Sequence, residues 1–117
     1  MKTVLIVDDS SIMRRIMKSI VTKNGYEVVG EASNGKAAVN KFRELRPDIV
    51  TMDVVMDEMS GLEALKKIKS EYPDAKVIMV SSMGQEVIVR DAIVFGAKNF
   101  LLKPFDEMQV VEALKKL

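Results

Sequence analysis

Short apolar segments and segments of helical periodicity alternate five times along this chain, and this alternation restricts the fold more than any other feature of the sequence. The apolar segments are rich in β-branched residues and short enough to be strands, whereas the segments between them repeat apolar residues every three or four positions. Strands that alternate with helices form a parallel sheet covered by helices on both faces. We therefore expect an α/β fold in which a doubly wound five-stranded parallel sheet and five helices form one domain over residues 1–117.

The expected strands cover residues 3–7, 27–32, 48–53, 76–81 and 99–102. The first three helices lie between them and begin or end at residues that suit helix termini: Ser10 as an N-cap, Gly25 as a final glycine, and Pro47 and Pro73 as residues that cannot continue a helix. The fourth and fifth helices are expected at residues 85–95 and 108–117.

The fourth helix has more apolar residues than one buried face needs. Its buried stripe is expected to consist of Ile88, Val89, Ala92 and Ile93. Val87 and Val94 then fall on a different face, which we expect to be exposed.

The carboxyl ends of the strands collect acidic residues. Asp8 and Asp9 follow the first strand, and Asp53 ends the third. In a doubly wound sheet, ligands bind outside these ends, where the strand order reverses. Two carboxylates about 5 Å apart repel by roughly 3 kcal/mol at an effective dielectric constant near 20. Because stability alone disfavours such a cluster, it predicts a site for a hard divalent cation, Mg²⁺ (or Mn²⁺), with oxygen ligands.

The fourth and fifth strands add hydroxyl groups and an ammonium group to the same edge. Ser81 and Ser82 end the fourth strand, and Lys103 follows the fifth. A phosphoryl group brought there with Mg²⁺ would meet Lys103, the Ser81 hydroxyl and backbone N–H groups. A carboxylate can attack phosphorus to form an aspartyl-phosphate, which gives a chemical role to Asp53 at the end of a buried strand.

The composition excludes several other kinds of chemistry. The chain has no Cys and no His, so thiolate nucleophiles, Ser–His catalysis and metal sites built from Cys or His are excluded within it. Its 18 Lys and Arg residues balance 17 Asp and Glu residues, which argues against direct nucleic acid binding. No apolar stretch reaches membrane-spanning length, so we expect no membrane insertion and a cytoplasmic location.

Four segments together resemble the receiver domain of bacterial response regulators: VLIVDDS, DIVTMDVVM with Gly61 downstream, VIMVSS and KPF. The resemblance covers essentially the whole chain, and the segment SSMGQ is most similar to chemotaxis receivers. It implies a flavodoxin-like sheet with strand order 2-1-3-4-5. It also implies a phosphorylation-activated signalling switch of a two-component system. Such a protein is a phosphoacceptor rather than an enzyme, with weak self-phosphorylation from small phosphodonors and autodephosphorylation.

The resemblance implies roles for the acidic residues. Asp53 would be the phosphoacceptor, and it would take the phosphoryl group from a histidine kinase in a Mg²⁺-dependent reaction. Asp9 would bind Mg²⁺ directly and Asp8 through water. Asp53 and the backbone carbonyl of Val55 would complete the set of protein ligands.

The resemblance also implies which groups bind the phosphoryl oxygens and respond to them. Lys103 would bind one oxygen, and the Lys103-Pro104 peptide bond is usually cis in the family. Ser81 would be the switch hydroxyl and Phe100 the switch aromatic residue. Backbone N–H groups would bind the remaining oxygens, from Val54, Val55 and Ser82.

The implied partners are a histidine kinase and an output protein such as a flagellar motor switch component, or a phosphatase. Many receivers use the fourth helix, fifth strand and fifth helix for output, so Val87 and Val94 are expected contacts. We expect a monomer, with a dimer through the same face as the alternative. The alternative function is that of the receiver portion of a longer response regulator that controls transcription or another output.

Three residues are notable near the phosphoacceptor. Asp57 stands where many receivers have Pro, and we expect it to be a solvated turn residue. Val55 and Met83 occupy positions that influence loss of the phosphoryl group in the family. Because both are apolar and cannot orient an attacking water, we expect slow autodephosphorylation.

Three other functions fit this sequence less well. A flavodoxin-like redox protein would need a phosphate loop rich in glycine and hydroxyl groups after the first strand, where Asp8 and Asp9 would repel a cofactor phosphate. An aspartyl phosphohydrolase of the haloacid-dehalogenase group would carry a DxD pattern, which VDDSS lacks. A receiver that acts without phosphorylation would not need the full set of Asp8, Asp9, Asp53, Ser81 and Lys103.

Overall fold

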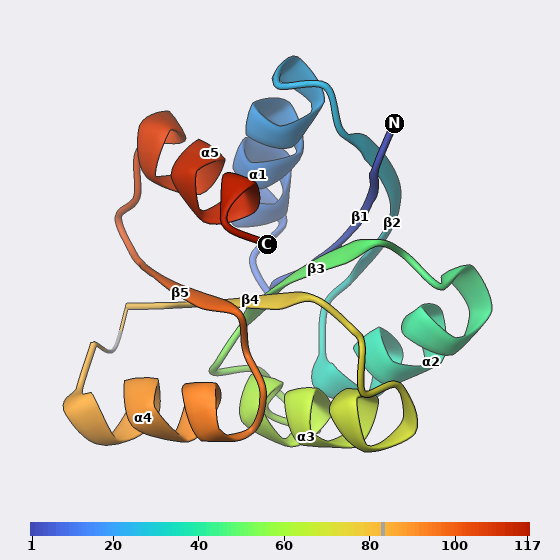
Figure 1. Cartoon of the computed structure of the whole chain (residues 1–117), viewed down its shortest axis with the longest axis vertical. Helices are drawn as coiled ribbons and strands as arrows, with labels where there is room; N and C mark the ends of the chain where they lie inside the picture. Colours follow the sequence, from blue (N-terminus) through green and yellow to red (C-terminus); the bar gives the residue numbers. More distant parts are fainter. Residues whose placement is uncertain (83) are drawn as a thin grey trace.

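The computed structural model describes residues 1–82 and 84–117, and a parallel sheet lies at its centre between two layers of helices (Figure 1). The strands are β1 (Thr3–Val7), β2 (Glu27–Ala32), β3 (Ile49–Asp53), β4 (Val77–Ser81) and β5 (Asn99–Leu102). The helices are α1 (Ser11–Lys23), α2 (Gly35–Leu45), α3 (Gly61–Glu71), α4 (Glu86–Val94) and α5 (Glu107–Lys115). Every expected element is present; β1, β2 and β5 have the expected bounds, and the ends of β3, β4, α4 and α5 differ from the prediction by at most two residues.

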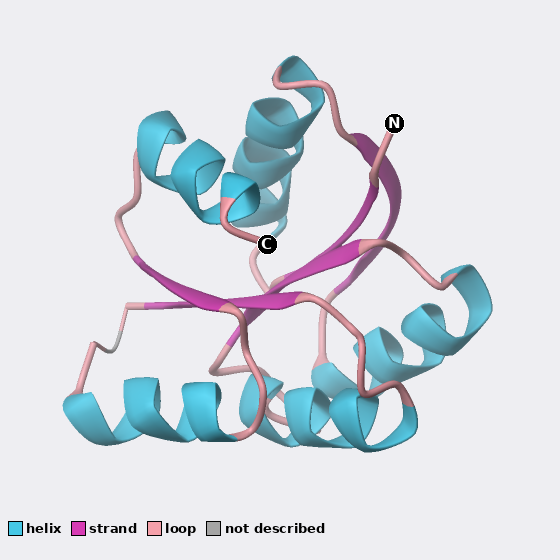
Figure 2. Cartoon of the chain, in the orientation of Figure 1, coloured by secondary structure: helices cyan, strands magenta, loops and turns pink. Residues whose placement is uncertain are grey.

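The sheet has the order β2-β1-β3-β4-β5, and all four pairings are parallel. This confirms the fold class and the strand order. Figure 2 shows helices on both faces of the sheet: α1 and α5 cover one face, and α2, α3 and α4 cover the other. Since β1 connects to β2 on one side and β3 lies on its other side, the strand order reverses between β1 and β3.

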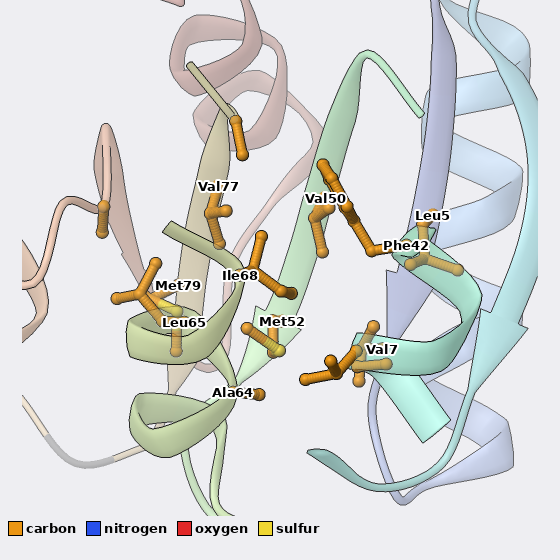
Figure 3. Packing of buried hydrophobic residues seen from close by; sticks show 14 of the residues in the cluster. Leu5, Val7, Phe42, Val50, Met52, Ala64, Leu65, Ile68, Val77 and Met79 are labelled. Atoms are coloured by element: carbon orange, nitrogen blue, oxygen red, sulfur yellow. The ribbon is translucent and has the colours of Figure 1, made fainter. Parts of the chain in front are cut away.

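The two helical layers bury two apolar clusters against the sheet. Figure 3 shows the larger cluster, in which Phe42 of α2 and Leu65 and Ile68 of α3 pack on Val50 and Met52 of β3. The smaller cluster joins α1 and α5 to the opposite face. Every residue of β3 and β4 is buried, and apart from Thr51, Asp53 and Ser81 these central strands consist of apolar residues on both faces.

Side chains cap four of the five helices at their N-termini. The Ser10 hydroxyl accepts from the Met13 N–H at 3.2 Å, which confirms the predicted N-cap of α1. Asn34 and Ser60 cap α2 and α3 in the same way, and Asp106 and Gln109 form a capping box on α5. Gln85 makes no side-chain cap at α4.

One prediction about α4 is wrong. Ala92 is buried, and Ile88 and Val89 are half-buried, but Ile93 is 51% exposed. The helix lies near the edge of the sheet against α3 and β5, so the buried strip is narrower than the apolar stripe in the sequence. Val87 and Val94 are exposed, as expected.

Candidate functional site

Three carboxylates converge at the carboxyl ends of β1 and β3. One ligand oxygen each from Asp8, Asp9 and Asp53 can be chosen so that all lie within 4.8 Å of one another. Asp8 and Asp53 are buried and Asp9 is exposed. The convergence follows from the pairing of β1 with β3, because adjacent parallel strands end at the same edge of the sheet. Three hard oxygen donors this close fit a divalent cation such as Mg²⁺.

Lys103 places its ammonium among these carboxylates. Its Nζ lies 2.9 Å from Asp8 Oδ2 and 3.6 Å from Asp53 Oδ2. The Lys103 N–H donates to the Ser81 carbonyl at 2.9 Å, which extends the pairing of β4 with β5, and the Lys103-Pro104 peptide bond is cis as expected. The ammonium therefore lies closer to the carboxylate of Asp8 than to that of Asp53, the expected phosphoacceptor.

The pKa of Asp53 is raised from 3.8 to about 6. Burial is the main cause, because it disfavours the charged form, and the negative charges of Asp8 and Asp9 raise the pKa further. The positive charge of Lys103 and the N–H of Val54 act in the opposite direction. Burial and the neighbouring carboxylates together therefore outweigh the ammonium and the N–H, and the charged form of Asp53 is disfavoured.

Both carboxylate oxygens and the backbone N–H of Asp8 make hydrogen bonds. Its Oδ1 accepts from the Ser10 N–H at 2.9 Å and its Oδ2 accepts from Lys103. Its own N–H donates to the Ala32 carbonyl at 3.0 Å. The sequence predicted Ser10 only as a helix cap, whereas its backbone also fixes the rotamer of Asp8.

The residues expected to sense the phosphoryl group lie on β4 and β5. Ser81 is the last residue of β4 and is 1% exposed, and Ser82 beyond it is exposed. Phe100 pairs in register with Met79 and is half-buried, packed against the cluster beneath α2, α3 and α4. Met83 lies outside the described residues.

The loop after β3 follows the strand closely before it turns away. The Val54 N–H donates to the Val80 carbonyl at 2.9 Å, so this expected phosphoryl donor already takes part in the sheet. The side chain of Val55 is exposed beside the site. Gly61 donates to the Val54 carbonyl, and a Cβ at Gly61 would collide with the Asp53 carbonyl, so the loop needs glycine there.

Asp57 is exposed on this loop and does not belong to the carboxylate cluster, which agrees with a solvated turn residue.

A hollow of about 470 Å³ lies elsewhere, at the amino ends of the strands, where Phe42, Arg46 and Tyr72 line it. Its lining does not include Asp8, Asp9 or Asp53, so this hollow is separate from the carboxylate cluster. None of the described helices is long and apolar enough to cross a membrane.

One residue at the site was missed by the sequence analysis. Arg14 donates from Nη1 to the carbonyl oxygen of Asp8 at 2.7 Å. An arginine on an amphipathic helix is usually a solvated residue, and no local pattern distinguishes this one. Its contact depends on how α1 lies beside β1 and β2.

The fold is that of a response regulator receiver, and the chain belongs to that family: the family model of the response regulator receiver domain matches residues 4–115. Its homologues include chemotaxis proteins of the CheY type. The chain is 56% identical over 116 residues to "Chemotaxis protein CheY" of Thermotoga maritima, which covers 99% of this chain and 97% of that protein. It is 53% identical over 113 residues to "Chemotaxis protein CheY" of Bacillus subtilis, with 97% and 94% covered.

A solved structure shows the same architecture. The chain matches the crystal structure of the CheX-CheY-BeF3-Mg²⁺ complex from Borrelia burgdorferi with a TM-score of 0.95 at 36% identity. The match covers 97% of this chain and 86% of the other.

Proposed function

We propose that this chain is a phosphorylation-dependent switch that accepts a phosphoryl group on Asp53 from the phosphohistidine of a partner kinase. The observation that carries the proposal is the cluster of Asp8, Asp9 and Asp53, whose ligand oxygens lie within 4.8 Å of one another beside the ammonium of Lys103. Such a cluster destabilises the fold unless a cation binds there. Its relatives named as chemotaxis proteins favour chemotaxis or flagellar motor control as the output.

The donor set fits Mg²⁺. Asp9 and Asp53, with the backbone carbonyl of Val55, would hold the ion, and Asp8 would support it through water. When bound, Mg²⁺ neutralises negative charge on the carboxylates and on the incoming phosphoryl group. The complex from Borrelia burgdorferi, which holds Mg²⁺ and BeF3, supports Mg²⁺ as the proposed ion.

The side chains of the site are arranged for direct transfer. A carboxylate oxygen of Asp53 attacks the phosphorus, and the bond from phosphorus to the kinase histidine breaks as the new P–O bond forms. Lys103 already lies 3.6 Å from Asp53 Oδ2, so a small movement of its flexible side chain brings the ammonium to a phosphoryl oxygen. The N–H groups of Val55 and Ser82 are the proposed donors to the other oxygens, and Val54 would share its N–H with Val80.

Phosphorylation would change the surface through Ser81 and Phe100. Ser81 is at the end of β4 beside the site, and its hydroxyl would move toward the phosphoryl group. Phe100 is half-buried, so part of its side chain would become buried if it turned inward as Ser81 moved. The change is a population shift between two states that interact differently with the phosphoryl group.

The surface that we expect phosphorylation to change carries several exposed apolar side chains. Val94 is 71% exposed on α4 and Met108 is 74% exposed on α5, and Leu102 of β5 lies exposed as well. A hollow lined by residues of β5 and α5, including Phe100 and Met108, connects the proposed switch residue to this face. We propose this face, made of α4, β5 and α5, as the contact for a motor switch component or a phosphatase.

The test is intact mass after incubation with acetyl phosphate, for the wild-type chain and Asp53→Asn, with and without Mg²⁺. We expect one phosphoryl increment on the wild type only, and only with Mg²⁺. If no increment forms, the same samples are incubated with beryllofluoride and Mg²⁺. A chain that takes up neither phosphoryl nor beryllofluoride contradicts the proposal.

A further inference from the structure

Arg14 links the end of β2 to the acidic loop after β1. Its Nε donates to Glu31 Oε1 at 3.1 Å, and its Nη1 donates to the Asp8 carbonyl at 2.7 Å. The Arg14 side chain is only 20% exposed, and that of Glu31 is 39% exposed. The guanidinium therefore bridges β2 and the loop after β1 in a partly buried environment. A charge-assisted hydrogen bond is stronger there than on an open surface.

The carbonyl that Arg14 contacts belongs to the peptide group between Asp8 and Asp9. A peptide group is planar, so fixing its oxygen fixes the direction in which the chain continues to the Cα of Asp9. The Asp8 N–H is held from the other side by the Ala32 carbonyl at 3.0 Å. Both contacts meet near the end of β2, which lies beside β1 in the sheet (Figure 1).

Asp9 depends on this support more than Asp8 does. The Asp8 carboxylate accepts hydrogen bonds from Ser10 and Lys103. Asp9 is exposed, and no side chain or backbone group in residues 1–82 or 84–117 donates a hydrogen bond to its carboxylate. The backbone of Asp9 sets the direction of its Cα–Cβ bond and therefore the region that its carboxylate can reach.

We propose that Arg14, oriented by Glu31, is a positioning residue that holds the Asp8–Asp9 peptide group so that the Asp9 carboxylate faces the cation site. Arg14 thereby sets the affinity of the free protein for Mg²⁺. This inference rests on the proposed function, because it assumes that Asp9 is a ligand of the ion. Groups that orient metal ligands commonly change metal affinity when they are removed.

The charge of Arg14 predicts the opposite result. A cation close to the carboxylates repels Mg²⁺, so removal of the guanidinium would tighten Mg²⁺ binding if charge alone mattered. If Arg14 acts by positioning, its removal weakens binding despite the loss of repulsion. The sign of the change separates the two.

The experiment is calorimetric titration of the metal-free full chain with Mg²⁺ alone, without any phosphodonor. Arg14→Met keeps the apolar stem and removes the donors, and we expect a dissociation constant about 10-fold higher than that of the wild type. Arg15→Met removes the same charge from the next, exposed position of α1 and is expected to bind Mg²⁺ at least as tightly as the wild type. In phosphorylation by acetyl phosphate, Arg14→Met should need proportionally more Mg²⁺ for half-maximal rate and keep its rate at saturating Mg²⁺.

A second pair of variants keeps the test valid if Arg14→Met does not fold. Glu31→Gln and Glu31→Ala remove the same charge, but only Gln retains an acceptor for Arg14 Nε. We expect Glu31→Ala to bind Mg²⁺ more weakly than Glu31→Gln. Equal affinities within this pair, or an Arg14→Met chain that binds as tightly as the wild type, overturn the positioning role. A wild-type chain that does not bind Mg²⁺ overturns the proposed function together with it.

Discussion

Lys103 donates a hydrogen bond to Asp8 at 2.9 Å, although Asp53, the proposed phosphoacceptor, lies only slightly farther from the same ammonium at 3.6 Å. The ammonium of Lys103 therefore lies between two buried carboxylates, and its shorter contact is with Asp8 and not with the proposed phosphoacceptor. In the free protein Lys103 acts as a counter-ion. Phosphorylation of Asp53 would give it a stronger anionic partner.

Lys103→Met should separate these two roles. Loss of the ammonium leaves Asp8 and Asp53 without their counter-ion, so we expect the metal-free chain to lose about 1.5–3 kcal/mol of stability. Mg²⁺ should bind more tightly, because a competing cation is gone, while phosphorylation by acetyl phosphate should be strongly reduced. Urea unfolding and Mg²⁺ titration measure these effects. Lys103→Arg keeps the charge and serves as control, and an unchanged stability of Lys103→Met would contradict the counter-ion role.

Asp53→Asn should change how stability depends on pH. Because the pKa of Asp53 is about 6 in the folded chain and 3.8 ordinarily, the native state binds more protons than the unfolded state between these values. The free energy of unfolding therefore falls as pH rises through this window, by up to about 3 kcal/mol at about 1.4 kcal/mol per pKa unit. Asp53→Asn lacks this loss and should melt at a higher temperature than the wild type at pH 7 without metal.

Urea unfolding of both chains at pH 4 and pH 7, with chelator, checks this prediction. Asp57→Asn removes an exposed carboxylate outside the cluster and should leave the stability nearly unchanged. Addition of Mg²⁺ should stabilise the wild type more than Asp53→Asn. A lower melting temperature for Asp53→Asn than for the wild type at pH 7 would show that the buried, charged carboxylate of Asp53 does not destabilise the folded chain.

A polar residue at position 55 should shorten the life of the phosphorylated state. Val55 is exposed next to the site and offers no group to orient an attacking water. In Val55→Asn the amide can hold that water, so we expect decay of the phosphorylated chain to accelerate roughly tenfold or more. Decay is followed by intact mass after removal of the donor. Val87→Asn makes the same change on α4 as a control, and equal decay in Val55→Asn and the wild type would rule out this explanation of slow dephosphorylation.

A charge on the outer face of α4 should weaken output without blocking phosphorylation. Val94→Lys places an ammonium where we propose an apolar partner contact, and we expect about a tenfold loss of affinity for the motor switch component, or about 1.4 kcal/mol. The assay is titration of the beryllofluoride-loaded chain. Ile16→Lys makes the matching change at an exposed position of α1, on the other face of the sheet. Equal affinities for the two variants would move the contact away from α4.

Predictions that depended on local pattern were confirmed more fully than those that depended on neighbouring elements. The strand β5 was placed at the residues where it occurs, because the apolar run Phe100, Leu101 and Leu102 lies between a glycine and a proline. Ile93 was predicted to be buried from its spacing on α4, and it is exposed because the helix lies near the edge of the sheet. Spacing along a helix defines a stripe, but the width of the neighbouring layer decides how much of it is covered.

The sequence by itself determined the order in which strands and helices follow one another along the chain and the parallel sheet that they form. It also determined the set of residues at the carboxyl edge of that sheet: Asp8, Asp9, Asp53, Ser81 and Lys103. These follow from periodicity and from the rule that parallel strands present the same ends together. Only the tertiary structure decided that Lys103 pairs first with Asp8, that Arg14 reaches the Asp8 carbonyl, and that burial raises the pKa of Asp53. Each of these depends on distances of a few ångströms between elements far apart in the chain, and such distances are set by packing.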